Sequence, residues 1–110
     1  MANQFTDRAC IVLTTWPNRQ KALKFAQQIV ENQLAACVNL LPEICSVYAW
    51  EGKIEQAEEH QMLIKTCNHL VPEIVQQLAI HHPYSEPECI SIDIADGAES
   101  YLNWIKDHCR

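Results

Sequence analysis

The side chains best suited to chemistry gather in one short segment of the C-terminal half. Residues 81–88, His-His-Pro-Tyr-Ser-Glu-Pro-Glu, place two imidazoles, a phenol and two carboxylates close to two prolines. Imidazole and carboxylate are ligand types that suit Cu(II) and Zn(II). Neighbouring helical side chains point about 100° apart, so His81 and His82 can chelate one ion only where the helix breaks before Pro83. A structural role also fits His81, because the helix dipole favours a cation at a helix C-terminus.

Other residues of chemical interest stand singly along the chain. A catalytic cysteine needs a lowered pKa and an exposed, electropositive setting, whereas Cys10 and Cys37 lie among small and apolar residues. We therefore expect buried structural thiols there. Trp50 ends an apolar alternation and suits either a binding edge or packing at an interface. Lys65 is a cation within an apolar strand pattern, which favours an acidic partner, with Glu88 a candidate, or a ligand.

Length and composition limit what the chain can be. Its 110 residues give room for one core, so we expect a single domain over residues 1–110. The two glycines cannot form a Gly-rich phosphate loop. No nucleophile, base and orienting group are grouped, so we expect no enzyme. The net charge is -6 and the lysines and arginines are scattered, so we expect no nucleic acid and no membrane as partner.

Six cysteines in a short chain first indicate a disulfide framework. However, they are spread along the chain with no C-x-x-C pair, and residues 1–8 lack the pattern of a secretory signal. We therefore expect reduced thiols in a cytoplasmic protein. The stability that so small a core lacks must then come from a metal or from oligomerisation.

Apolar periodicity predicts seven elements. A continuous apolar run predicts a first strand covered on both faces, followed by a helix that Asn18 caps. Pro42 predicts a bulge in the second strand, and residues 51–53 predict a tight turn that makes strands two and three a long hairpin. Pro83 ends the second helix, and Asp96 begins the last one. The expected order is strand, helix, strand, strand, helix, strand and helix, at residues 9–15, 19–34, 37–50, 54–64, 70–81, 89–95 and 96–109.

This order of elements predicts an α+β fold of the ferredoxin-like, split βαβ class with a C-terminal helix added. In that arrangement two helices cover one face of an antiparallel sheet. The second face, which carries Trp50, has only the short last helix to cover it. An exposed apolar face of that size predicts a partner surface, and a symmetric homo-oligomer is the simplest solution.

Five motifs in this order resemble the CutA (CutA1) divalent-cation tolerance family. They are LAACVN at 34–39, YAWEGK at 48–53, MLIKT at 62–66, HPY at 82–84 with PE at 87–88, and YLNW at 101–104. The resemblance implies a ferredoxin-like subunit in a homotrimer similar to the PII signalling proteins. It also implies a cytoplasmic protein linked to tolerance of copper and other divalent metals, with no established catalytic reaction.

The resemblance further implies copper ligands at His81 and His82 and a cysteine in the first strand, where this chain has Thr14. A hydroxyl is a poor copper ligand beside a thiolate, so affinity for Cu(I) should suffer most. Our hypothesis is a site for Cu(II), zinc or another divalent cation on the two histidines, with Glu88, in a cleft between subunits. We expect Trp50, Lys65 and Tyr84 to line that cleft.

Two other hypotheses stay open at this point. The trimer could be a PII-like small-molecule sensor that receives an anion against Lys65, with metal tolerance a downstream effect. It could instead be a structural, trimeric anchor for a partner protein.

Overall fold

The chain alternates strands and helices in the order expected from the sequence. The computed structural model describes residues 7–110. Its elements are β1 (Ala9–Trp16), α1 (Arg19–Glu31), β2 (Cys37–Trp50), β3 (Lys53–Cys67), the 3-10 turn η1 (Asn68–Leu70), α2 (Val71–His81), β4 (Ile90–Asp93) and α3 (Glu99–Asp107). The strands lie in the order β2-β3-β1-β4, and each neighbouring pair is antiparallel. The predicted α+β class is confirmed.

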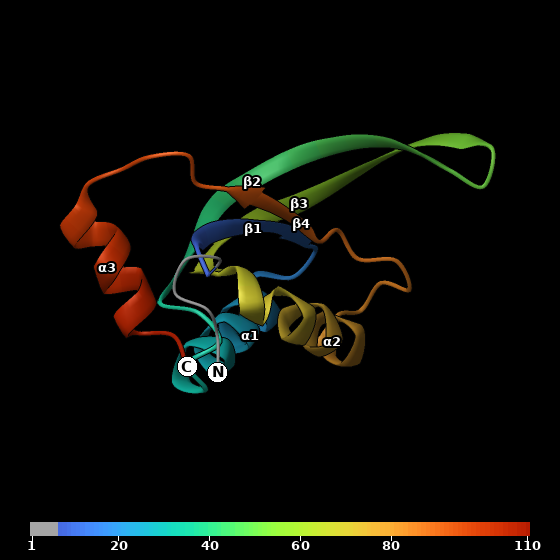
Figure 1. Ribbon diagram of the computed structural model, residues 1–110. Coiled ribbons are helices and arrows are strands. Elements are labelled where there is room, and N and C mark those ends of the chain that lie inside the picture. The colour runs from blue at the N-terminus through green and yellow to red at the C-terminus, as the bar shows by residue number, and fades with distance from the viewer. Residues whose placement is uncertain (1–6) are drawn as a thin grey trace.

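Two helices cover one side of the sheet. Figure 1 shows α1 and α2 together beneath one face, with α3 standing at one end. Asn18 caps α1 as predicted, since its side chain accepts a 2.9 Å hydrogen bond from the Lys21 amide. The core lies between the sheet and the two helices. Its buried residues include Val12, Trp16, Ala22, Phe25, Ile29, Met62, Ile64, Ile74 and Leu78.

Side-chain alternation divides the sheet into two unlike faces. On the helix side, Val12 of β1 pairs with Ile64 of β3, and both are fully buried. The next residue faces the other way: Ile11 pairs with Lys65 of β3 and with Ile92 of β4. Ile92 remains 48% exposed because α1 and α2 lie on the opposite side. We call this second side the open face.

The β2–β3 hairpin extends well beyond the rest of the sheet (Figure 1). Its pairing shifts register across Pro42, which has no N–H to donate, so the predicted bulge is confirmed. At the tip, Glu51 and Gly52 have positive φ angles of 48° and 79°. Two successive positive φ values characterise the type I′ turn, whose twist matches that of a hairpin. The projecting strands leave side chains such as Ile54 largely exposed.

Helix α1 ends at Glu31, three residues before the expected end. Gln33 adopts a left-handed conformation with φ 58°. Its amide donates to Val30 O at 3.0 Å, and the Leu34 amide donates to Ile29 O at 2.8 Å. These two bonds form a Schellman motif, which stops a helix and satisfies its last carbonyls. Leu34 is therefore a buried residue of the following segment and not part of the helical stripe.

The C-terminal elements are shorter than the sequence predicted. β4 pairs only with residues from Cys10 to Leu13 of β1, which limits it to four residues. Asp96 does not cap the last helix, because its carboxylate accepts from the adjacent Gly97 amide at 2.8 Å. The N-cap is Ala98, which has no capping side chain. Among residues 7–110, none of the helices combines the length and the apolar character needed to cross a bilayer.

Candidate functional site

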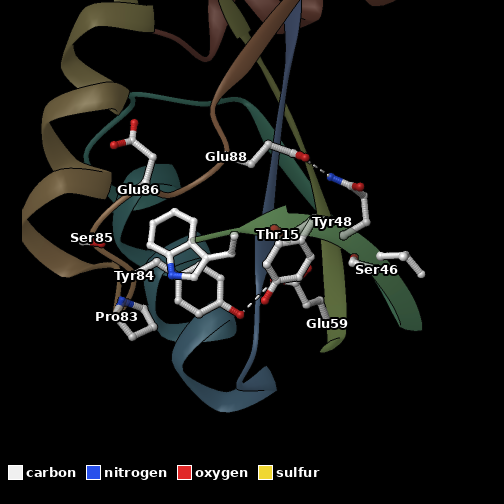
Figure 2. A pocket seen from close by; sticks show the side chains of 12 residues that line it. Thr15, Ser46, Tyr48, Glu59, Pro83, Tyr84, Ser85, Glu86 and Glu88 are labelled. Atoms are coloured by element: carbon white, nitrogen blue, oxygen red, sulfur yellow. Dashed lines mark hydrogen bonds between the residues drawn. The ribbon is translucent and has the colours of Figure 1, made fainter. Parts of the chain in front are cut away.

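A cavity of about 710 Å³ opens at the root of the hairpin, on the open face. It lies where the end of β1, the β2–β3 hairpin and the loop between α2 and β4 meet (Figure 2). Strand alternation places Glu59 and Gln61 of β3 on the open face with Lys65. The aromatic and charged side chains that line the cavity are Tyr48, Trp50, Tyr84, Glu59, Glu86 and Glu88.

A partly buried contact between Tyr84 and Glu59 forms one part of the lining. The Tyr84 hydroxyl points at Glu59 and donates to its Oε2 at 2.9 Å (Figure 2). Glu59 is only 5% exposed. Burial first, and then this hydrogen bond, raise the pKa of Tyr84 to about 12. The phenol is therefore neutral at physiological pH and acts as a donor toward a carboxylate.

The imidazole of His82 is a structural group in the single subunit. It is 7% exposed and packs between the rings of Trp16 and Tyr84, whose centroids lie 4.3 and 4.9 Å away. Nδ1 accepts from the Tyr84 amide at 3.1 Å, so Nε2 carries the proton and donates to Thr15 O at 2.7 Å. Burial lowers the pKa of His82 and keeps it neutral. His82 thus ties the loop to the end of β1 and positions Tyr84.

The second imidazole of the pair, His81, points elsewhere. It is exposed at the last residue of α2, with its ring 6.3 Å from that of Phe25, and it does not line the cavity. The structure therefore does not bring His81 and His82 together as a chelate within one subunit. Over residues 7–110 no three His, Cys, Asp or Glu side chains are grouped closely enough to hold a metal ion.

Lys65 does not pair with Glu88, so that expectation is wrong. Its Nζ donates to the Tyr101 hydroxyl at 3.1 Å and lies 5.4 Å from the centre of that ring. The hydrogen bond with Tyr101 raises the pKa of Lys65. Glu88 instead accepts from the Gln61 amide at 3.1 Å. Lys65 lies six residues along β3 from Glu59, roughly 20 Å, and is outside the cavity.

The cavity contains three of the four predicted cleft residues, Trp50, Tyr84 and Glu88. Glu59 is not among the predicted cleft residues, because the polar character of residues 54–60 argues against deep burial there. The alternation of side chains along β3 could have predicted its position, since Glu59 shares its face with Gln61 and with the half-buried Leu63. This alternation indicates that the Glu59 side chain lies against the root of the hairpin and not in solvent.

Thr14, which stands where the resemblance expects a cysteine, faces the core. It is fully buried, and within the described residues its hydroxyl has no hydrogen-bond partner. Thr15, the next residue, is the one that lines the cavity. A side chain at position 14 therefore points away from the cavity and toward the helices.

All six cysteines are free thiols, with different surroundings. Cys10 is buried as expected, whereas Cys37 is half-buried. Cys67 and Cys109 are hydrogen-bonded to each other where the C-terminus packs on β3. The bond from Cys67, together with the nearby His69, lowers the pKa of Cys109 to about 7 and raises that of Cys67.

Comparison with known proteins gives a consistent result over nearly the whole chain. The family model described as CutA1 divalent ion tolerance protein matches residues 10–108. "Protein CutA, chloroplastic" from Arabidopsis thaliana is 41% identical over 100 residues, which are 91% of this chain and 55% of that protein.

Solved structures match the fold as well. The divalent cation tolerance protein (Cut A1) from Thermus thermophilus has a TM-score of 0.90 at 35% identity, covering 93% of this chain and 99% of that one. The periplasmic divalent cation tolerance protein CutA from Archaeoglobus fulgidus has a TM-score of 0.87 at 34% identity, with 91% and 97% covered.

Proposed function

Because this chain belongs to the CutA1 divalent ion tolerance protein family, we propose that it acts in tolerance by binding divalent cations directly, as a homotrimer. No catalytic activity is named for the family. The observation that supports cation binding best is the charge of the cavity. Each charged side chain of its lining, Glu59, Glu86 and Glu88, is a carboxylate. A cleft lined by one sign of charge concentrates ions of the opposite sign.

The open face supports assembly into a homotrimer. On the open face, Ile90 and Ile92 of β4 retain 52% and 48% exposure, and on the other side of the projecting hairpin Val47 and Ile54 retain 63% and 75%. Apolar surface of this extent favours a protein partner, and a closed symmetric oligomer of one chain is the commonest kind. The projecting hairpin is long enough to reach across such an interface onto a second copy.

Analytical ultracentrifugation tests the assembly. We expect a mass close to three times 12.6 kDa for the protein. Ile92→Lys should produce monomers, because burying an unpaired charge is costly. Leu23→Lys is the control, since the Leu23 side chain is 47% exposed on α1, on the other side of the sheet, against 48% for Ile92. A monomeric wild-type protein would contradict the proposal.

One subunit offers two separate sets of metal ligands, the exposed imidazole of His81, which lies outside the cavity, and the carboxylates around the cavity. Imidazole with carboxylate suits Cu(II) and Zn(II). Since one subunit groups no three ligands over residues 7–110, we propose that a second subunit completes the site. His82 can join only by exchanging its bond from the Tyr84 amide for a metal bond at Nδ1. With Thr14 in the core, no first-strand thiol contributes.

Calorimetric titration of Cu(II) and Zn(II) tests this site. We expect His81→Ala to weaken binding by roughly tenfold or more, as loss of a metal-supporting group commonly does. His108→Ala is the matched control, because His108 is an exposed histidine near the C-terminus of α3 whose Nδ1 contacts Trp104 O at 2.8 Å. Equal affinities for wild type and His81→Ala would refute direct binding at this residue. His82→Ala also loosens the loop, so its result is interpreted only beside a folding measurement.

We also propose that the protein works in a reducing compartment such as the cytoplasm. The six free thiols support this, because structural disulfides are the usual adaptation to oxidising compartments. Alkylation of the protein in freshly lysed source cells, followed by mass spectrometry, should label six cysteines. Recovery of a fully disulfide-bonded form would contradict this assignment.

A further inference from the structure

Glu59 is a buried carboxylate with no positively charged partner among residues 7–110. It is 5% exposed, and within the described part of the chain its one hydrogen bond comes from the neutral Tyr84 phenol at 2.9 Å. None of the ion pairs within residues 7–110 includes it. Burying a carboxylate without a counter-ion is costly, so a cation that enters the cavity would recover part of that cost.

Two polar side chains close to Glu59, Gln61 and Tyr84, already have their hydrogens engaged in hydrogen bonds. The side-chain amide of Gln61 donates to Thr14 O at 2.8 Å and to Glu88 at 3.1 Å, so its carbonyl oxygen remains as an acceptor. The Tyr84 hydroxyl donates its hydrogen to Glu59. A ligand that binds to Glu59 and to the Gln61 carbonyl must therefore bring its own donors.

Aromatic side chains provide the remaining recognition surface. Trp50, Tyr48 and Tyr84 line the same cavity as Glu59. The faces of these rings attract cations, with tryptophan the strongest, and their carbon surface packs well against an alkyl chain. Carboxylate and aromatic groups together favour a positive charge carried on an organic framework.

From these features we propose that the cavity binds a small organic ammonium ion with N–H donors, of the alkylamine or polyamine class. Glu59 accepts from the ammonium group, and the aromatic rings contact its carbon chain. The volume of about 710 Å³ lies in the usual range for small-molecule sites and far exceeds the roughly 30 Å³ share of one water molecule. This ligand goes beyond the proposed metal binding and does not depend on His81.

The charges of the lining favour a positively charged small-molecule ligand over a negatively charged one. The alternative sensor hypothesis places an anion against Lys65, but Lys65 contacts Tyr101 and lies outside the cavity. An anion in the cavity would meet Glu59, Glu86 and Glu88 with no cationic side chain in the lining. A cation is therefore the ligand that the lining favours.

Isothermal titration of the metal-free protein, in a buffer with EDTA, tests the proposal with spermidine as the probe. We expect spermidine to bind, and Glu59→Gln to weaken its affinity about tenfold or more, because hydrogen bonds to charged groups are stronger than those between neutral groups. The control is Glu58→Gln, an exposed carboxylate on the preceding residue of β3, which should leave the affinity within about twofold. Tetramethylammonium, which has no N–H group, should bind more weakly than spermidine, and succinate should not bind.

Three results would overturn the proposal. The first is no spermidine binding by the folded wild-type protein. The second is equal weakening by Glu58→Gln and Glu59→Gln, which would show nonspecific attraction to a chain of net charge -6. The third is dissociation of the oligomer by Glu59→Gln without any spermidine effect, which would assign the counter-ion to a second copy. Zn(II) titration of the wild type and spermidine titration of His81→Ala separate the two ideas, because the proposed metal site needs His81 and the ammonium site does not.

Discussion

The contact between Tyr84 and Glu59 yields a prediction that can be worked out quantitatively. Tyr84→Phe removes the one hydrogen-bond donor that residues 7–110 provide to a buried carboxylate, and it changes little else in shape. A hydrogen bond to a charged group contributes about 1.5–3 kcal/mol, so we expect the free energy of unfolding to fall by about that amount. In a Glu59→Gln background the same change removes only a neutral hydrogen bond, and the loss should shrink to about 0.5–1.5 kcal/mol.

Urea unfolding of the wild type, the two single variants and the double variant measures both losses in free energy of unfolding. All four are compared at one protomer concentration, because oligomers gain stability with concentration. The difference between the two losses is the coupling energy of the pair. Tyr48→Phe is the control: this tyrosine also lines the cavity but is 42% exposed, and its loss should be close to zero. If Tyr84→Phe lowers the free energy of unfolding equally in the wild type and in the Glu59→Gln background, the hydroxyl does not stabilise the fold through the carboxylate. That result would refute the prediction.

Three further predictions concern other parts of the molecule. Gln33→Gly should raise the free energy of unfolding by about 1 kcal/mol, because φ is 58° at this position and glycine adopts a left-handed conformation without strain. Asn32→Gly is the control and should give no such gain, since φ is -85° there. Thermal unfolding of the two variants measures the difference. The Asp7 hydrogen bond raises the pKa of His69, so His69 stabilises the fold fully below the unfolded pKa and this contribution is lost as pH rises through the folded pKa. The loss of melting temperature caused by His69→Asn should therefore be larger near about pH 6 than near about pH 9, and a pH-independent difference would contradict the assignment. Alkylation of Cys109 should show a midpoint near the pKa of about 7, and a midpoint at the value of an ordinary thiol would contradict the contact with Cys67.

Most of the fold follows from local patterns in the sequence. Asn18 caps a helix and Pro42 interrupts a strand pair through their own chemistry, so both effects are visible without the structure. The ends of elements depended on tertiary context. Gln33 gives no sequence signal for a left-handed residue, and Asp96 has the composition of a cap but bonds to its neighbour. β4 is short because β1 provides only four partners.

The candidate site was predictable in part. The 82–84 motif does position Tyr84, and Trp50, Tyr84 and Glu88 do line one cavity. The role of His82 was not predictable from the sequence. Its Nε2 donates to the backbone oxygen of Thr15, which is far away in the chain, and its Nδ1 accepts from the backbone amide of Tyr84, which no side-chain pattern reveals. The partner of Lys65 was missed since Tyr101 comes from α3, which only the packing of the C-terminus brings to β3.

The most direct test of cation binding is anomalous diffraction from crystals of the protein grown with Zn(II). We predict a peak next to His81, at about 2.0–2.1 Å from an imidazole nitrogen, with a carboxylate oxygen of the cavity region and a ligand from a second subunit completing the site. Zinc found only at isolated surface residues such as His108, with none beside His81 or the cavity, would contradict direct binding as the basis of tolerance.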